Sequence, residues 1–285
     1  MEQQKKIKLY QSRDFGGNFD TSIAFIKQNY GAILKSLLIF IPVLLVAVYL
    51  FMDILTFSTA GVYAQTDPEG VFFSIFSWKF FVGMLLIMVA SYITYLYPFC
   101  YMVAYEESTD GVVNSADVWA KVRKSALPLI GYGIIYFILV LIGTMLCFIP
   151  GIIIGVYLSL YIYVYLVEDR GVVQTFQRSY DLVSHNWWVT FGLMILFWLI
   201  IIVISFVFTL PVYGTMLGTL LKIDFLTGDI YIYITNLIRY IVSFFLNPVL
   251  CLVLGVMYYS YRNKLEGIST YDEIDQIGTN RDTQY

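Results

Sequence analysis

The sequence predicts an all-α polytopic membrane protein. We expect six transmembrane helices in three hairpin repeats, each preceded by a cytoplasmic amphipathic interfacial helix. Three observations lead to this prediction. The 285 residues are 59% hydrophobic and only 13% charged, whereas globular proteins carry about 25% charged residues. Six apolar runs approach or exceed the roughly 20 residues that cross a bilayer as a helix. The basic residues concentrate in alternate connections between these runs.

The six expected spans follow one another with connections of unequal length. They cover approximately residues 34–57, 79–104, 127–149, 151–167, 189–211 and 235–261. An amphipathic N-terminal segment, 1–32, precedes them, and a polar tail, 262–285, follows. Between the third and fourth spans lies only the turn Phe148-Ile149-Pro150-Gly151, which predicts a tight hairpin. The sixth span contains Asn247-Pro248, and a proline inside a helix interrupts or bends it.

The distribution of Lys and Arg predicts that both termini are cytoplasmic. With the N-terminus inside, 14 of the 17 basic residues fall in cytoplasmic segments, and only Lys79, Lys222 and Arg239 lie outside. Cytoplasmic connections carry such an excess of basic residues in multi-pass proteins.

Each cytoplasmic approach to the bilayer is predicted to be an amphipathic helix. Before the fifth span, apolar residues recur at three- and four-residue steps, which places them on one helical face: Val172, Val173, Phe176, Tyr180, Val183 and Trp187. Similar patterns run from Val112 to Ala126, including Trp119, and from Phe15 to Tyr30. Helices of this kind lie in the plane of the headgroup boundary.

The approaches also resemble one another in sequence, which predicts a threefold repeat; the alternative is chance similarity among apolar stretches. Residues 22–40 align without gaps on residues 179–197, so that Ser22, Asn29, Tyr30 and Phe40 meet Ser179, Asn186, Trp187 and Phe197. In the weaker middle copy, Ser125 takes the place of the asparagine.

We expect a structural corner where each approach meets its span. Asn29 or Asn186 is placed there to satisfy backbone groups left open at a helix start. The aromatic residues that follow are expected to anchor the corner at headgroup level. The expected corner and interface anchors are Asn29, Tyr30, Trp119, Pro150, Gly151, Asn186, Trp187 and Trp188.

Residues 148–196 show an ordered series of motifs. An Ile-Pro-Gly turn, a short aromatic-rich span, an acidic pair before a glycine, an amphipathic helix with Arg-Ser, and Asn-Trp at the next span follow in this order. In these motifs the chain resembles a group of bacterial six-helix membrane domains. The group includes the membrane domain fused to some glycerophosphodiester phosphodiesterases and the YciC-like inner-membrane proteins of unknown function. The resemblance implies a helical bundle in the bacterial inner membrane. It implies no activity and no site residues, and the short polar tail predicts no phosphodiester chemistry.

The sequence indicates no enzyme, metal site or cofactor. His185 is the single histidine, without the companions that a metal site needs. No nucleotide-binding or nucleophile motif occurs. Glu106-Glu107 and Glu168-Asp169 precede amphipathic helices and are expected to supply negative charge to their N-termini; an acid–base or cation site is the alternative. The net charge of −3 predicts no nucleic-acid partner.

Three residues within the apolar runs are candidate contacts for a lipid or substrate, because polar groups in spans are functional suspects. Lys35 stands where the other repeats have glycine, and it either snorkels to the headgroups or contacts an anionic group. Asn247 either caps a packing kink or faces a polar cavity. Arg239 is expected to reach the outer headgroups.

Two functions follow as hypotheses. The first is a non-catalytic scaffold or lipid-interacting protein of the inner membrane. Its partners would be membrane lipids and a protein bound by the amphipathic helices or the tail. The alternative is a small transporter or lipid-translocating protein with a polar site around Lys35 and Asn247. The identity of the lipid, solute or partner and the oligomeric state stay open.

Overall fold

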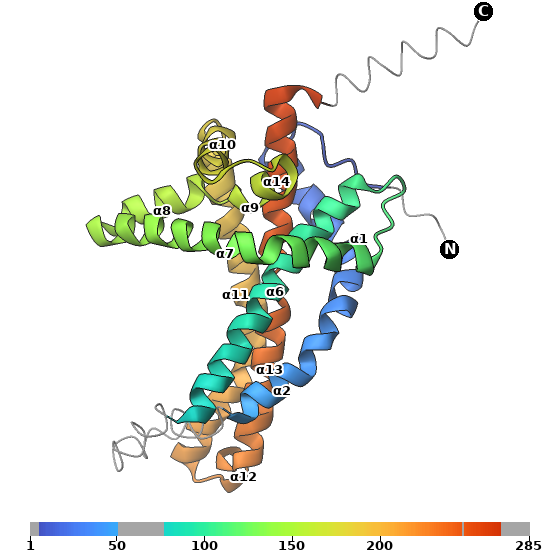
Figure 1. Cartoon of the computed structure of the whole chain (residues 1–285). Coiled ribbons are helices and arrows are strands. Elements are labelled where there is room, and N and C mark those ends of the chain that lie inside the picture. Colours follow the sequence, from blue (N-terminus) through green and yellow to red (C-terminus); the bar gives the residue numbers. More distant parts are fainter. Residues whose placement is uncertain (1–5, 51–76, 247, 269–285) are drawn as a thin grey trace, which may run out of the picture. The chain divides into compact units, whose positions relative to one another are not determined.

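The computed structural model describes residues 6–50, 77–246 and 248–268, and all regular structure within them is helical (Figure 1). The expected all-α class is therefore confirmed for this part of the chain. The helices are α1 (Phe15–Leu37), the short 3₁₀ helix η1 (Leu38–Phe40), α2 (Ile41–Leu50), α6 (Trp78–Glu107), α7 (Ser115–Leu146), α8 (Phe148–Tyr157), α9 (Tyr161–Glu168), α10 (Val172–Ser184), α11 (Trp187–Leu221), α12 (Asp224–Thr227), α13 (Asp229–Leu246) and α14 (Val249–Glu266).

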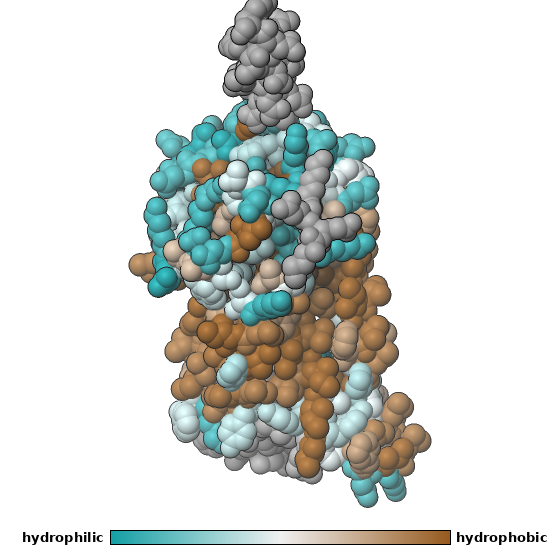
Figure 2. Space-filling view, turned by 90° about the vertical axis from the view of Figure 1, so that its right-hand side faces the viewer, coloured by the Kyte–Doolittle hydropathy of each residue, from teal (hydrophilic) through white to brown (hydrophobic). Residues whose placement is uncertain are grey.

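Six helical segments are long and apolar enough to cross a membrane, as expected of a multi-pass membrane protein. They are Phe15–Ala47, Trp78–Glu107, Ser115–Leu146, Phe148–Glu168, Trp187–Leu221 and Ile230–Glu266. Many of their large apolar side chains are exposed, and Figure 2 shows hydrophobic residues over a wide area of the visible face. A water-soluble monomer rarely exposes so large an apolar surface.

Residue contacts divide the chain into two compact units. The first unit comprises residues 1–33, 96–197 and 249–285, and the second comprises residues 34–95 and 198–248. The first unit holds eleven of the fifteen described Lys and Arg residues and ten of the twelve described Asp and Glu residues. Charge is therefore concentrated in the first unit, whereas the described part of the second carries four basic and two acidic residues.

The expected corners are not equally visible in the helices. α1 runs without interruption through Asn29 and Tyr30, and α7 runs without interruption through Ser125. Asn29 caps no helix start, because its side-chain Nδ2 donates to the Phe25 carbonyl oxygen one turn earlier in the same helix. Only the third approach, α10, is a helix separate from the span that follows it. An expected break at the other two positions was therefore wrong.

The hairpin between the third and fourth spans turns at Cys147, one residue earlier than expected. Pro150 and Gly151 lie in the first two turns of α8, where proline is tolerated because the first amide groups of a helix have no partner. The fourth span is two helices, since α8 ends at Tyr157 and α9 begins at Tyr161. The sixth is interrupted next to Pro248, between α13 and α14, as the proline predicts.

Candidate functional site

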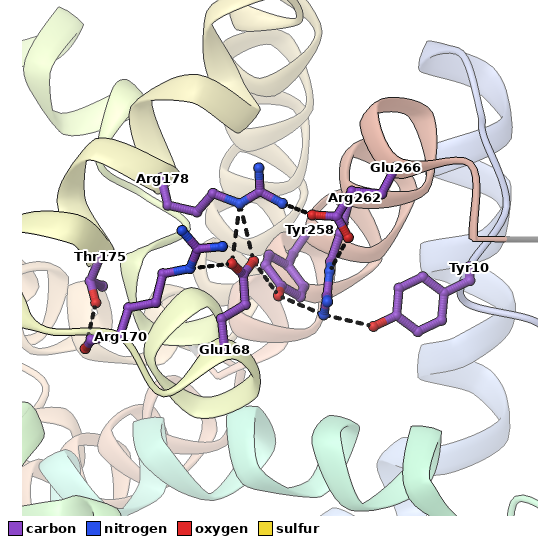
Figure 3. A network of polar contacts seen from close by, with 8 residues as sticks. All are labelled: Tyr10, Glu168, Arg170, Thr175, Arg178, Tyr258, Arg262 and Glu266. Carbon is purple, nitrogen blue, oxygen red and sulfur yellow. Dashed lines mark hydrogen bonds and ion pairs between the residues drawn. The ribbon is translucent and has the colours of Figure 1, made fainter.

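A network of charged side chains joins α9, α10 and α14 in the first unit, and its centre is Glu168 (Figure 3). The Glu168 side chain is only 4% exposed. Its carboxylate forms an ion pair with Nε of Arg170 at 2.7 Å and accepts from Nε of Arg178 at 3.2 Å. The Tyr258 hydroxyl donates to the same carboxylate at 3.0 Å. A buried carboxylate needs such charged and polar partners, because burial alone disfavours its ionised form.

The network continues along α14 to the N-terminal segment. Arg178 also pairs with Glu266, whose second oxygen accepts from Nε of Arg262 at 2.8 Å. Nη1 of Arg262 donates to the Tyr10 hydroxyl at 3.1 Å. Burial raises the pKa of Tyr10, while the positive charge of Arg262 acts in the opposite direction. The network therefore ties a residue before α1 to the last turn of α14.

The segment before α1 is attached at further points of the same unit. Nζ of Lys6 donates to the main-chain oxygens of Glu106 and Ser108 at 2.8 and 2.7 Å, where α6 ends. This satisfies carbonyl groups that a helix C-terminus leaves open. The main-chain amide of Arg13 donates to the Ser260 hydroxyl of α14 at 3.1 Å. Leu9, between these contacts, is fully buried.

The arrangement of charges favours a structural role for the network. All four carboxylate oxygens of Glu168 and Glu266 accept from guanidinium groups or a phenol. Three arginines face these two glutamates, so one positive charge is in excess. From the sequence, Glu168 was expected only to supply negative charge to the start of α10. In the structure it is a buried acceptor that holds three side chains. Asp169 instead ends α9 in the left-handed conformation, with φ 45°.

A second polar arrangement lies where α8 and α9 are separated. The Ser179 hydroxyl of α10 donates to the Tyr157 carbonyl oxygen at 2.9 Å and accepts from the Leu160 amide at 3.2 Å. Ser159 donates to the Val156 carbonyl oxygen at 2.8 Å. These bonds satisfy backbone groups that the interruption of the helix leaves without a helical partner. Ser179 and Leu160 are both fully buried.

The structure places Asn29 and Tyr30 inside α1 rather than at a corner. Asn29 is buried, and its Oδ1 accepts from the Tyr101 hydroxyl of α6 at 3.2 Å. Tyr30 is half-buried, and its hydroxyl has no hydrogen-bond partner among the described residues. Asn29 therefore connects two helices, a role that the sequence did not indicate.

Asn186 lies at the junction of α10 and α11, where the sequence placed a corner. Its Oδ1 accepts from Nζ of Lys264 at 3.0 Å, and its carbonyl oxygen accepts from the Thr190 hydroxyl at 3.0 Å. The ring of the next residue, Trp187, stacks on Phe191 at 4.9 Å between centroids. Trp188, in contrast, is 78% exposed.

The remaining predicted anchors pack against neighbouring helices. The Trp119 ring lies 5.0 Å from the Tyr97 ring, centroid to centroid. Gly151 touches Thr144 so closely that a Cβ there would overlap its side chain and backbone. Small residues allow this approach of α7 and α8. Pro150, one residue before, shares the first turn of α8.

The three candidate ligand contacts are not joined by any described interaction. Lys35 is exposed in the last turn of α1. Arg239 is half-buried in α13, where it contacts Asn236 and Tyr240. Asn247 lies outside the described residues.

Sequence reasoning missed most of the charged network. One signal was available, because Arg262 and Glu266 are four residues apart and face each other on a helix. The pair Arg178–Glu266 joins residues 88 positions apart. No local pattern marks such a contact, since tertiary packing creates it.

Comparison with known families found one match. A family model described as "Domain of unknown function (DUF7847)" matches residues 136–260, from the middle of α7 to α14. Comparisons with curated proteins and with solved structures found no match. The match covers the Ser179 arrangement and much of the charged network, but it names no activity.

Proposed function

We propose that the chain is a non-catalytic scaffold of the membrane that also engages lipid headgroups. The charged network carries this proposal. Its two carboxylates pair with guanidinium groups from other helix ends, which favours a structural role over acid–base catalysis for these residues. A site for acid–base chemistry needs a titratable group within reach of a substrate.

Six spans that cross the membrane in alternation would bring the start of α1, the end of α6, the start of α11 and the end of α14 to the same side of a bilayer. The excess of basic residues in the connections on that side favours the cytoplasmic side, with both termini inside. The resemblance to bacterial membrane domains favours the inner membrane.

The face of α10 that points away from the protein is suited to the lipid interface. The helix buries Thr175, Phe176, Ser179, Leu182 and Val183 against the protein. On its other side Val173 and Tyr180 are exposed, and Trp188 follows at the start of α11. Arg170, which precedes α10, has a 43% exposed side chain. Aromatic and apolar side chains beside a cation match the boundary between acyl chains and anionic headgroups. The proposed equivalence of α10 with the starts of α1 and α7 rests on the sequence pattern alone.

The test is native mass spectrometry of the protein extracted together with its surrounding membrane. A stoichiometric protein partner or a defined homo-oligomer is the result expected of a scaffold. Trp188→Ala, at an exposed anchor, should weaken retention of anionic lipid, while Lys222→Gln, at an exposed basic residue of the second unit, should not.

The transporter hypothesis makes the opposite prediction in reconstituted vesicles. If the protein carries a solute or exchanges lipid between leaflets, and Lys35→Ala or Asn247→Ala abolishes that flux, the scaffold proposal is wrong. If no flux is measured, or if both variants leave the flux unchanged, a transport site around Lys35 and Asn247 is excluded.

A further inference from the structure

The hairpin of α7 and α8 extends beyond the helices that anchor it. Figure 1 shows the two helices side by side, running away from α9, α10 and α14 of the same unit. Near its base the hairpin is packed, since the Tyr132 ring of α7 lies 4.8 Å from the Tyr165 ring of α9, centroid to centroid. At its tip Met145, Leu146 and Phe148 are 80%, 79% and 70% exposed. Such a surface requires an apolar environment.

A hydrogen bond at the base fixes the level from which the hairpin starts. The Tyr132 hydroxyl donates to the main-chain oxygen of Arg170 at 3.0 Å. The Arg170 side chain is 43% exposed and pairs with Glu168. A solvated guanidinium paired with a carboxylate belongs at the headgroups, because a charge within the hydrocarbon is costly. Tyr132 is therefore level with one surface of the bilayer.

From this level the hairpin is too short to cross the bilayer. Cys147, at the turn, follows Tyr132 by 15 residues. A helix of that length extends about 22 Å, whereas the hydrocarbon is about 30 Å thick. The returning helix α8 has only 10 residues, or about 15 Å. These lengths are upper limits for the depth of the tip, because Figure 1 shows α7 running across α14 rather than along it.

The tip also lacks the residues that mark a membrane surface. Residues 137–156 contain no charged residue, no tryptophan and no tyrosine. By contrast, the stretch from the end of α11 to the first turn of α13 carries Lys222, Asp224 and Tyr231. Aromatic and charged residues of this kind gather where a segment reaches the water at either side of a membrane. The tip therefore has no anchor for a second surface.

The backbone of the turn limits the depth of the tip in a second way. The first amides of α8 have no helical partners, and Cys147 offers them no side-chain cap. Pro150 removes one of these donors, because proline has no amide hydrogen. The other open amides disfavour the centre of the hydrocarbon. A tilted hairpin keeps them close to the headgroups of the leaflet that it enters.

We propose that the α7–α8 hairpin is a wedge within a single leaflet, the one on the side of Arg170. Its exposed apolar side chains contact the acyl chains of that leaflet. The other four apolar segments cross the bilayer, whereas the hairpin enters and leaves on one side. Both termini keep the same side under this arrangement, so the proposal does not rest on the scaffold role.

The native thiol at the turn tests the proposal without any substitution in the hairpin. Cys147 is exposed, whereas Cys100 and Cys251 are buried. Sealed right-side-out and inside-out vesicles are treated with a membrane-impermeant maleimide. We expect Cys147 to be protected in both and to be labelled once detergent dissolves the membrane.

Two control variants in a Cys147→Ser background report the two sides of the membrane. Lys8→Cys, before α1, and Lys222→Cys, after α11, place a thiol at exposed positions. They should be labelled from opposite sides. Labelling of Cys147 from the side that labels Lys222→Cys would overturn the proposal, because the hairpin would then cross the bilayer. Labelling from the side that labels Lys8→Cys would overturn the acyl chains as its partner, because the tip would then lie in water.

A spin label on Cys147 distinguishes lipid from protein around the tip. In reconstituted vesicles we expect collisions with oxygen, which dissolves among acyl chains, to be severalfold more frequent than collisions with a water-soluble nickel chelate. Rare collisions with both reagents would overturn the acyl chains as partner, because a protein surface such as a second copy would then cover the tip.

Discussion

The Ser179 hydroxyl donates to the Tyr157 carbonyl oxygen at 2.9 Å, across the gap where α8 stops and before α9 starts. The same hydroxyl accepts from the Leu160 amide at 3.2 Å. One side chain of α10 therefore satisfies two of the backbone groups at the interruption, which helps to explain how a span can be broken in an apolar environment.

Ser179→Ala should destabilise the protein by about 1–3 kcal/mol, because it leaves a buried amide and a buried carbonyl without partners. Thermal unfolding in detergent measures the change. Ser184→Ala is the control, since Ser184 is on the same helix and its hydroxyl contacts near neighbours in the sequence, the Asp181 carbonyl oxygen and Nδ1 of His185. Equal stability of the two variants would show that the bridge contributes little.

Glu168→Gln should destabilise the protein by roughly 3 kcal/mol, the lower end expected for breaking a buried ion pair, because Arg170 and Arg178 lose a charged acceptor. The lower end applies since the Arg170 side chain is 43% exposed and regains water. Denaturant unfolding is the measurement. Glu107→Gln removes a carboxylate that is 59% exposed and paired with Lys121, and a loss of at most about 1 kcal/mol is expected.

Gly255→Ala should prevent α14 from approaching its neighbours in the first unit. A Cβ at Gly255 would overlap the Met102 sulfur of α6 and the Tyr163 hydroxyl of α9. Overpacking of this kind costs about 1–3 kcal/mol or more. The yield of folded protein and its unfolding temperature report the effect. At Gly31, a Cβ meets nothing within 4 Å, so Gly31→Ala should be neutral or stabilising.

The two neighbouring tryptophans should differ in effect. Trp187→Ala removes a ring stacked on Phe191 and is expected to cost about 3 kcal/mol of stability in detergent. Trp188→Ala should leave that stability nearly unchanged, because the side chain is 78% exposed. Thermal unfolding separates the two, and a larger loss in Trp188→Ala would contradict the assignment of Trp188 to the lipid interface.

The raised pKa of Tyr10 predicts that the protein loses stability at high pH. Burial raises its pKa above the ordinary value of 10.0, so the unfolded chain loses its proton first as the pH rises. The stabilisation is complete below that value and is lost through the folded-state pKa. Tyr10→Phe should flatten the decline above pH 10, measured as unfolding free energy against pH. Tyr180→Phe, at an exposed tyrosine, should show the same decline as the wild type.

The all-helical class and the number of apolar segments could be read from the sequence because they depend on local properties. A single apolar run that is long enough to cross the bilayer is stable there as a helix, since a helix satisfies its own backbone hydrogen bonds. Pro248 likewise marks an interruption without any knowledge of its neighbours, because proline lacks an amide hydrogen. The junction between α10 and α11 at Asn186 was indicated by another local pattern, an asparagine and a tryptophan between the amphipathic stretch and the apolar run.

Tertiary structure alone decided which polar residues meet. Asn29 and Asn186 align in sequence, yet one is a buried partner of Tyr101 within a continuous helix and the other accepts from Lys264 at a junction. The break in the fourth span depends on Ser179, which lies 22 residues from the carbonyl group it satisfies. Glu168 gains its partners only when α9, α10 and α14 pack together. The sequence by itself determined the helical class and the number of apolar segments, because the hydrogen bonds of a helix are local. The partners of each buried polar group were decided by packing, because a group removed from water must find whichever donor or acceptor the fold brings to it.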